Sequence, residues 1–203
     1  HLDRYPSSVA GLRAVLVRRA ERSHAHHGGD PEESQPIIEA TLVRMAELGF
    51  LGLTIPERHG GSGLSWVDLV VLLEETGRSL LPSPLLTHTL AATALLQAGS
   101  EEQRDRWLPR LADGSSIGSL ALREASDFHG AEGVTLMGQP EGAGFRLSGE
   151  KRCVADPEAA DFFVVAFRRG EAARDLGLAI VEADAPGVSA RAFPMIDATK
   201  RMG

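Results

Sequence analysis

Cysteine is almost absent from this sequence of 203 residues, because Cys153 stands alone. One cysteine cannot form a disulfide within the chain, and this fits the reducing environment of the cytoplasm. The sequence also lacks the run of about 20 apolar residues that a membrane-spanning helix needs. Its start has charges on both sides of a short apolar stretch, which argues against a signal peptide. We therefore expect a cytoplasmic protein without a membrane span.

Clusters of basic residues are missing as well. Lys and Arg together number 21 against 28 Asp and Glu, the formal net charge is −7, and no run of basic residues forms a stripe. Binding to nucleic acid depends largely on counterions that are released when basic side chains neutralise phosphates. We therefore expect no nucleic-acid partner.

Several binding and catalytic motifs do not occur. The sequence has no G-x-G-x-x-G, no Walker lysine and no G-x-S-x-G. The segment GGSGLS at 60–65 is interpreted as a tight turn that uses the access of glycine to positive φ. The histidines within 24–27 lie in a polar loop without a helical pair of ligands, so no metal site is predicted. Taken alone, Cys153 is interpreted as a small core residue.

Hydrophobic periodicity predicts helices in the first half of the chain. The expected helices cover 9–22, 37–48, a segment that begins after Ser65, 85–97, and a segment that begins after Ser100. The helix at 85–97 is apolar all round, which predicts that it is buried on all sides. Inward-facing residues are expected in the helices that begin after Ser65 and after Ser100: Trp66, Leu69, Val70, Leu73, Trp107, Leu108 and Leu111.

After residue 115 the pattern changes to short strands separated by turn signals. The expected strands cover 117–122, 133–137, 144–148, 162–167, 176–182 and 188–192. Helices that precede strands in this way indicate an α+β chain. We expect a helical domain over 1–115 and a β-domain over 116–203.

Four stretches in order carry a resemblance to a known family. They are LGFLGLTIPERHGGSGLS, VVLLEETGRSL, AGSEEQRDRWLPRLADGSSIGSLALREASDFHGA and FRLSGEKRCVADPEAADFFVV, with GLAIVEADAPGV further on. The patterns P-E-x-x-G-G-x-G, G-x-E-E-Q-x-x-x-W-L-P-x-L-A-x-G and G-x-K occur at matching spacings, and together they are specific. Over residues 37–203 the sequence resembles the flavin-dependent acyl-CoA dehydrogenases.

The resemblance implies a fold and a reaction. The fold is an amino-terminal all-α helical domain, then a β-barrel-like middle domain, then a carboxy-terminal four-helix domain that is not in this chain. The reaction is the FAD-dependent α,β-dehydrogenation of an acyl-CoA thioester, in fatty-acid or steroid side-chain degradation. The base is a carboxylate expected after Gly203, so no catalytic residue is named. Implied partners are an acyl-CoA substrate, an electron acceptor protein and further subunits, in a homo- or hetero-oligomeric dimer or tetramer.

The resemblance also implies a flavin site built from two segments. Flavin contacts are carried over to these positions: Leu120, Leu122, Arg123, His129, Cys153, Val154 and Ala155. His129 is also carried over as a substrate contact. The sequence departs from the family pattern here, because Arg123 stands in place of a Thr, Cys153 in place of a Trp, and Ala155 in place of a Thr.

These departures leave three hypotheses open. The first is an active acyl-CoA dehydrogenase subunit with an unusual flavin site. The second is a flavin-poor, catalytically degenerate subunit that supports an active partner in a hetero-oligomer. The third is a relative that uses the fold for another purpose, such as a flavin oxidase, a flavin monooxygenase or a nucleic-acid-associated protein. The acidic balance of the chain weakens the nucleic-acid version.

Overall fold

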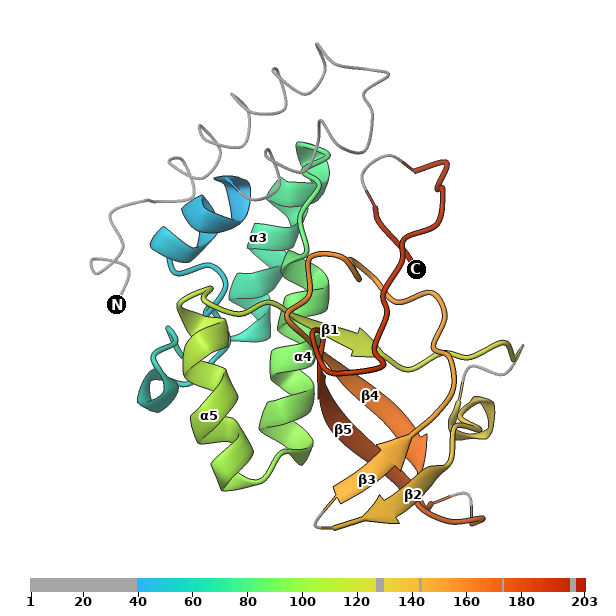
Figure 1. Ribbon diagram of the computed structural model, residues 1–203. Coiled ribbons are helices and arrows are strands. Elements are labelled where there is room, and N and C mark those ends of the chain that lie inside the picture. Colours follow the sequence, from blue (N-terminus) through green and yellow to red (C-terminus); the bar gives the residue numbers. More distant parts are fainter. Residues whose placement is uncertain (1–39, 127–129, 143, 173, 198–199) are drawn as a thin grey trace. The chain divides into compact units, whose positions relative to one another are not determined.

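The computed structural model describes residues 40–126, 130–142, 144–172, 174–197 and 200–203 (Figure 1). They divide into two compact units. The first contains the described residues of His1–Leu86 together with Glu101–Ser115, and the second contains Thr87–Ser100 and the described residues of Ser116–Gly203. The expected helix at 9–22 lies outside the described residues.

Helices build the first unit. A helix covers 40–47, a short 3₁₀ helix η2 covers Glu57–His59, and α3 and α5 cover Trp66–Arg78 and Glu101–Ala112. The helix α3 begins after Ser65, whose backbone N–H donates to Asp68 Oδ2 over 2.9 Å, so an N-terminal donor of the helix is satisfied.

The buried face of α3 differs from the prediction. Leu69, Leu72 and Thr76 are buried, whereas Trp66 and Val70 are 52% and 51% exposed. Apolar residues cover most of the circumference of this helix, so their spacing fits more than one stripe and does not select the one that packs. In α5 the prediction is confirmed, because Trp107, Leu108 and Leu111 are all buried.

The glycine-rich segment after η2 is a turn, as predicted. Gly60 and Gly63 have φ of +83° and +61°, values that side chains with a Cβ rarely adopt. A Cβ on Gly61 would lie 2.0 Å from the backbone oxygen of Ile55, so this position has no space for a larger residue.

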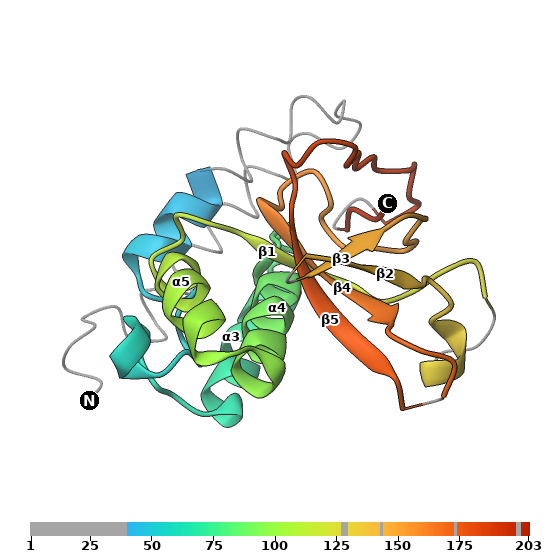
Figure 2. The same cartoon turned by 60° about the horizontal axis from the view of Figure 1, so that its bottom comes forward.

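A three-stranded sheet and one helix form the centre of the second unit. The sheet has the order β1-β4-β5, from Gly118–Ala121, Phe162–Arg168 and Leu176–Glu182. β1 pairs with β4 in parallel, and β4 pairs with β5 in antiparallel orientation. The helix α4, Leu85–Ala98, packs closely on β1, since a Cβ on Gly118 would lie 2.8 Å from the Cβ of Ala91 (Figures 1 and 2).

Not all of α4 is buried, in contrast to the prediction. Leu86 and Leu90 are 45% and 39% exposed, while Ala91, Ala92 and Leu95 lie in the core. A uniformly apolar helix therefore has one face that the described residues leave open.

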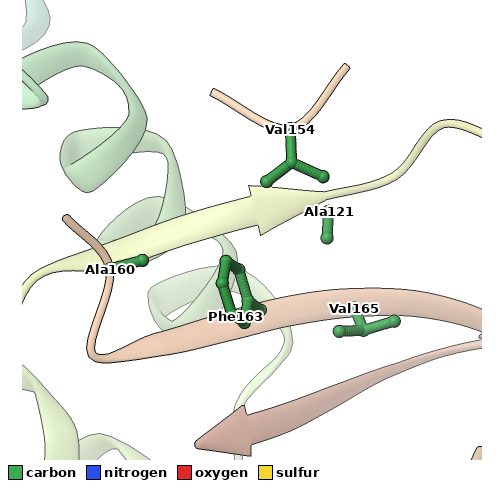
Figure 3. Packing of buried hydrophobic residues seen from close by; sticks show 5 residues of the cluster. All are labelled: Ala121, Val154, Ala160, Phe163 and Val165. Atoms are coloured by element: carbon green, nitrogen blue, oxygen red, sulfur yellow. The ribbon is translucent and has the colours of Figure 1, made fainter. Parts of the chain in front are cut away.

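Both faces of β4 are covered. Its residues Phe162 to Phe167 are all buried, which is the pattern of a central strand. On one face, Phe163 and Val165 form a cluster with Ala121 of β1 and with Val154 and Ala160 from the connecting segment (Figure 3). This cluster ties the segment around Val154 to the sheet.

Two of the predicted strands are wrong. Residues 133–137 do not form a strand; a 3₁₀ helix η3 covers Ala131–Gly133, and β2 begins only at Gly138, covers Gly138–Glu141 and forms a hairpin with β3, Gly144–Leu147. The backbone N–H groups of Thr135 and Leu136 donate to a side-chain carboxylate instead of a strand. Residues 188–192 also form no strand, because Val188 N–H closes a turn with Ala185.

The α+β class and the order of helices before strands are confirmed. The other four strands lie within a residue or so of their predicted bounds, because each is a short apolar or alternating run between turn signals.

Candidate functional site

Two loop segments lie side by side at the carboxyl end of β1. The first lip is the stretch 122–126 that follows β1, and the second lip is the stretch 151–156. The backbone N–H of Arg152 donates to the carbonyl of Arg123 over 2.8 Å, and Lys151 Nζ donates to the carbonyl of Leu122 over 3.2 Å. Segments that are far apart in sequence therefore form one edge.

A buried ion pair holds the two lips together. Lys151 Nζ lies 2.6 Å from Glu124 Oε1, and the two side chains are 8% and 9% exposed. Glu124 also accepts hydrogen bonds from the backbone N–H of Thr135 over 2.9 Å, from the N–H of Leu136 over 3.1 Å, and from the Thr135 hydroxyl. We call Glu124, Lys151 and Thr135 the clamp.

The clamp keeps Glu124 ionised. Burial by itself would raise the pKa of this carboxyl, but the hydrogen bonds from Lys151, Thr135 and Leu136 outweigh it and lower the pKa to about 2. Charged donors and backbone N–H groups stabilise the carboxylate over the acid. Glu124 is therefore a fixed negative charge that is fully paired within the protein.

The second lip is anchored on its other side by backbone hydrogen bonds. Val154 and Gly203 exchange two of them, of 2.8 and 2.9 Å, and Asp156 N–H donates to Arg201 over 2.9 Å. The Ala155 carbonyl accepts a hydrogen bond of 2.7 Å from the Ser119 hydroxyl. Ser119 in turn lies 3.0 Å from the hydroxyl of Thr87 in α4, so a buried chain of hydroxyl groups reaches from the helix to the lip.

Two residues of the second lip adopt left-handed backbone conformations. Cys153 and Asp156 have φ of +53° and +48°. Burial raises the pKa of Asp156 to about 6, although the charges of Lys200 and Arg201 act in the opposite direction. The turn directs the side chain of Val154 into the core cluster, where it is 5% exposed (Figure 3).

The predicted site residues fall into three groups. Leu122, Arg123 and Cys153 are exposed on the lips, which corrects the interpretation of Cys153 as a core residue. Leu120 on β1 and Ala155 are partly buried, and Val154 is buried. His129 lies outside the described residues. The structure therefore joins Leu122 and Arg123 to the second lip through Lys151 and Arg152, the residues that precede Cys153.

Sequence reasoning missed the residues that hold this edge. Glu124 and Lys151 are separated by 27 positions and Ser119 and Ala155 by 36, so no local pattern indicates their contacts. The signals were present only as a charged pair after an apolar strand and as the lysine of G-x-K. Among the described residues, no group of three or more His, Cys, Asp or Glu is placed to hold a metal ion. Within the same part of the chain, no helix has the length and apolar character that crossing a membrane requires.

The fold and the edge define a class of protein: a helical unit and a sheet unit whose lips meet at the end of a parallel strand. Residues 11–115 match the family model described as Acyl-CoA dehydrogenase, N-terminal domain. The chain is 30% identical over 148 residues to the acyl-CoA dehydrogenase FadE12 of Mycobacterium tuberculosis, covering 70% of this chain and 38% of the relative. It is 31% identical over 153 residues to the mitochondrial isovaleryl-CoA dehydrogenase of Pongo abelii, covering 72% and 36%.

Solved structures of acyl-CoA dehydrogenases are similar to this chain as well. The Tcur3481–Tcur3483 steroid ACAD variant has 33% sequence identity and a TM-score of 0.75, covering 96% of this chain and 53% of that chain. The acyl-CoA dehydrogenase of Geobacillus kaustophilus shares the fold, with 23% identity, a TM-score of 0.76 and the same coverage. This chain belongs to the acyl-CoA dehydrogenase family, and it spans between 36% and 38% of the length of the two curated relatives named above.

Proposed function

We propose that this chain is a subunit of an FAD-dependent acyl-CoA dehydrogenase, an oxidoreductase that acts on a CH–CH bond. The substrate class is an acyl-CoA thioester from fatty-acid or steroid side-chain degradation. The observation that carries the proposal is the meeting of the two lips at the end of β1, held by the buried Glu124–Lys151 pair. Membership of the acyl-CoA dehydrogenase family supports the same reaction class.

The exposed side chains of the lips suit one part of a flavin. Leu122 and Cys153 offer an apolar surface to a planar ring, and the guanidinium of Arg123 offers a positive charge to its electron-rich edge. The lips lack the Thr hydroxyls that the family pattern places at positions 123 and 155, and Cys153 offers less ring-covering surface than the Trp of that pattern. The lip chemistry thus fits the ring and its charge better than it fits the hydrogen bonds at its edge.

The residues proposed to hold the flavin are those carried over from the family: Leu120, Leu122, Arg123, His129, Cys153, Val154 and Ala155. When bound, the flavin supplies a two-electron acceptor for the hydride that leaves the β-carbon. Val154 contributes from the core by fixing the loop, since its side chain is buried. His129 is also proposed to contact the substrate.

No lip residue is proposed as the catalytic base. Glu124 is fully paired and has a pKa of about 2, so it is a poor proton acceptor at neutral pH. We propose that a carboxylate outside residues 1–203 removes the α-proton. The lips then act by orienting the cofactor and by placing the charge of Arg123.

We propose a cytoplasmic protein that forms a dimer or tetramer, with identical or different subunits, and that passes electrons to an acceptor protein. We propose that it binds no nucleic acid, because its formal net charge is −7.

A second candidate is a flavin-poor subunit that supports an active partner in a hetero-oligomeric acyl-CoA dehydrogenase. The favouring observation is that the second lip turns its polar backbone groups inward. The N–H groups of Val154 and Asp156 are engaged by 201–203, and the Ala155 carbonyl is engaged by Ser119. Because Ala155 stands in place of a Thr, the second lip has few polar groups left for a flavin edge.

One experiment separates the two candidates. The full-length protein is purified alone, its flavin content is measured from the visible spectrum, and a series of acyl-CoA thioesters is added without oxygen. The first candidate predicts stoichiometric flavin that bleaches with at least one thioester. Colourless protein that still lacks flavin after incubation with FAD supports the second candidate, and bound flavin that no thioester bleaches contradicts the first.

A further inference from the structure

The ion pair of the clamp has no catalytic step to perform, yet it is buried at the edge where the two lips meet. Buried ion pairs carry a desolvation cost that often cancels their attraction, so they are a weak source of stability. This one has several further hydrogen-bond partners. Glu124 accepts from Lys151, Thr135 and Leu136, and the same ammonium donates to the carbonyl of Leu122.

The clamp joins parts of the chain that the sheet does not join. β1 pairs with β4, and β2 pairs with β3, but the first lip, the second lip and the segment 134–136 have no strand pairing of their own with one another. The hydrogen bonds of Glu124 and Lys151 link all three. A backbone hydrogen bond from Arg152 to Arg123 joins the two lips in addition.

We infer that Glu124 and Lys151 are positioning residues that set the distance and angle between the two lips, and hence the surface that Leu122, Arg123 and Cys153 present. This inference rests on the proposed function for its link to FAD. The effect of the clamp on the lips themselves stands apart from that link.

The contacts of the clamp predict that the residues at positions 124 and 151 cannot be exchanged. If only the opposite charges mattered, exchanging them would restore the pair. Thr135 and Leu136 donate hydrogen bonds to position 124, so an ammonium there would face donors with no acceptor. The exchanged pair Glu124→Lys with Lys151→Glu is therefore expected to fail, whereas Lys151→Arg keeps a donor to Glu124 and to the carbonyl of Leu122.

The main test variant, called the clamp variant below, is the double substitution Glu124→Gln with Lys151→Met. It removes both charges together and leaves no unpaired buried charge, so it is expected to fold. The matched control is Glu141→Gln with Arg146→Met on the hairpin, a pair whose side chains are 54% and 66% exposed. Full-length wild type, both double variants, the exchanged pair and Lys151→Arg are compared.

Two measurements are made on each protein. Amide hydrogen exchange at Arg152 is expected to accelerate about tenfold or more in the clamp variant and the exchanged pair, and to stay near wild type in Lys151→Arg and the hairpin control. FAD affinity, measured by quenching of flavin fluorescence, is expected to fall about tenfold or more in the same two proteins.

The outcomes separate the positioning of the lips by the clamp from the binding of FAD at the lips. Unchanged exchange at Arg152 in the clamp variant overturns the inference, as does rescue by the exchanged pair. If exchange accelerates but FAD binds as tightly as in wild type, the link between clamp and cofactor is wrong. If wild type itself binds no FAD, the proposed flavin site fails, and the exchange measurement alone decides whether the clamp positions the lips. If the clamp variant unfolds, Thr135→Val takes its place because it removes the hydroxyl donor to Glu124. Exchange at Arg152 is then expected to accelerate in Thr135→Val and to stay near wild type in Lys151→Arg, and unchanged exchange in Thr135→Val overturns the inference.

Discussion

The clamp and the β2–β3 hairpin each hold a glutamate against a basic side chain, but in opposite surroundings. Glu124 and Lys151 are 9% and 8% exposed, and Glu124 also accepts hydrogen bonds from backbone N–H groups and a hydroxyl. Glu141 and Arg146 are 54% and 66% exposed, and Arg146 Nε donates to Glu141 over 3.0 Å. The buried pair thus links three segments of the chain, whereas the exposed pair lies on the surface of a single hairpin.

The largest expected effect comes from removing the cation of the clamp alone. Lys151→Met leaves Glu124 buried without its charged partner, and this is expected to lower the free energy of unfolding by about 3–5 kcal/mol. Urea denaturation of wild type and variant at neutral pH measures the difference. A loss below about 1 kcal/mol would place the clamp in the same category as an exposed pair.

A pH series is the next test, because the pKa of Glu124 is lowered from 4.5 to about 2. A lowered pKa stabilises the folded state above the unfolded pKa, and this stability is lost as pH falls from 4.5 towards 2. Between about pH 5 and about pH 3, wild type is expected to lose about 2 kcal/mol more than Glu124→Gln. Parallel curves for the two proteins would contradict the prediction.

The comparison with Glu124→Gln is needed because Asp156 acts in the opposite sense. Its pKa is raised from 3.8 to about 6, so its contribution to stability is fully present below 3.8 and is lost as pH rises through about 6. This contribution is common to both proteins and cancels in their difference.

The hairpin is sensitive at a different position. A Cβ on Gly138 would lie 2.5 Å from ring atoms of Phe167, which is buried in β4. Gly138→Ala is therefore expected to cost about 1–3 kcal/mol, because the aromatic ring must shift in a packed core. Thermal unfolding by circular dichroism checks this, with Gly142→Asn as the control: its φ is +58° and no atom lies within 4 Å of a Cβ there. Equal melting temperatures for Gly138→Ala and wild type would show that the ring moves freely.

A smaller loss is expected from the hydroxyl chain behind the second lip. Ser119→Ala removes the donor to the Ala155 carbonyl and the partner of Thr87. The expected cost is about 1–2 kcal/mol, because two buried polar groups lose a hydrogen bond. Chemical denaturation measures it, and Thr87→Ser, which keeps the hydroxyl, is the control. A stable Ser119→Ala protein would mean that Ala155 finds another donor.

The smallest effect is expected at the exposed pair. Arg146→Met is expected to change the free energy of unfolding by less than about 1 kcal/mol, since solvent and salt screen such pairs. The same denaturation measurement with and without added salt tests it. A loss as large as that of Lys151→Met would remove the distinction between the two pairs.

The sequence predicted the parts of the fold that depend on local pattern. The strand 162–167 was recognisable because it is a continuous apolar run, and α5 because its acidic start and inward Trp107 follow helical rules. The prediction of a strand at 133–137 was wrong because the apolar residues Val134, Leu136 and Met137 give this segment the local pattern of a strand. In the structure, the N–H groups of that segment are taken by Glu124, a residue ten or more positions away.

The candidate site was predicted in outline only. The resemblance singled out the two segments that the structure shows side by side, but nothing in either segment alone shows that they touch. Contacts such as Lys151 with Leu122, or Ser119 with Ala155, depend on the parallel pairing of β1 with β4. Pairing across more than 40 residues is a property of the folded chain, and local periodicity carries no record of it.

The shape of the second lip is fixed by its neighbours and not by the residue at its tip. Backbone hydrogen bonds at Arg152, Val154 and Asp156 and the buried side chain of Val154 hold the loop, while Cys153 projects from it. Mutation at position 153 can therefore change the chemistry of the tip while the fold is retained, within the limits of a φ of +53°. Position 153 therefore sets what the second lip presents to a ligand, while the residues around it set where the lip lies.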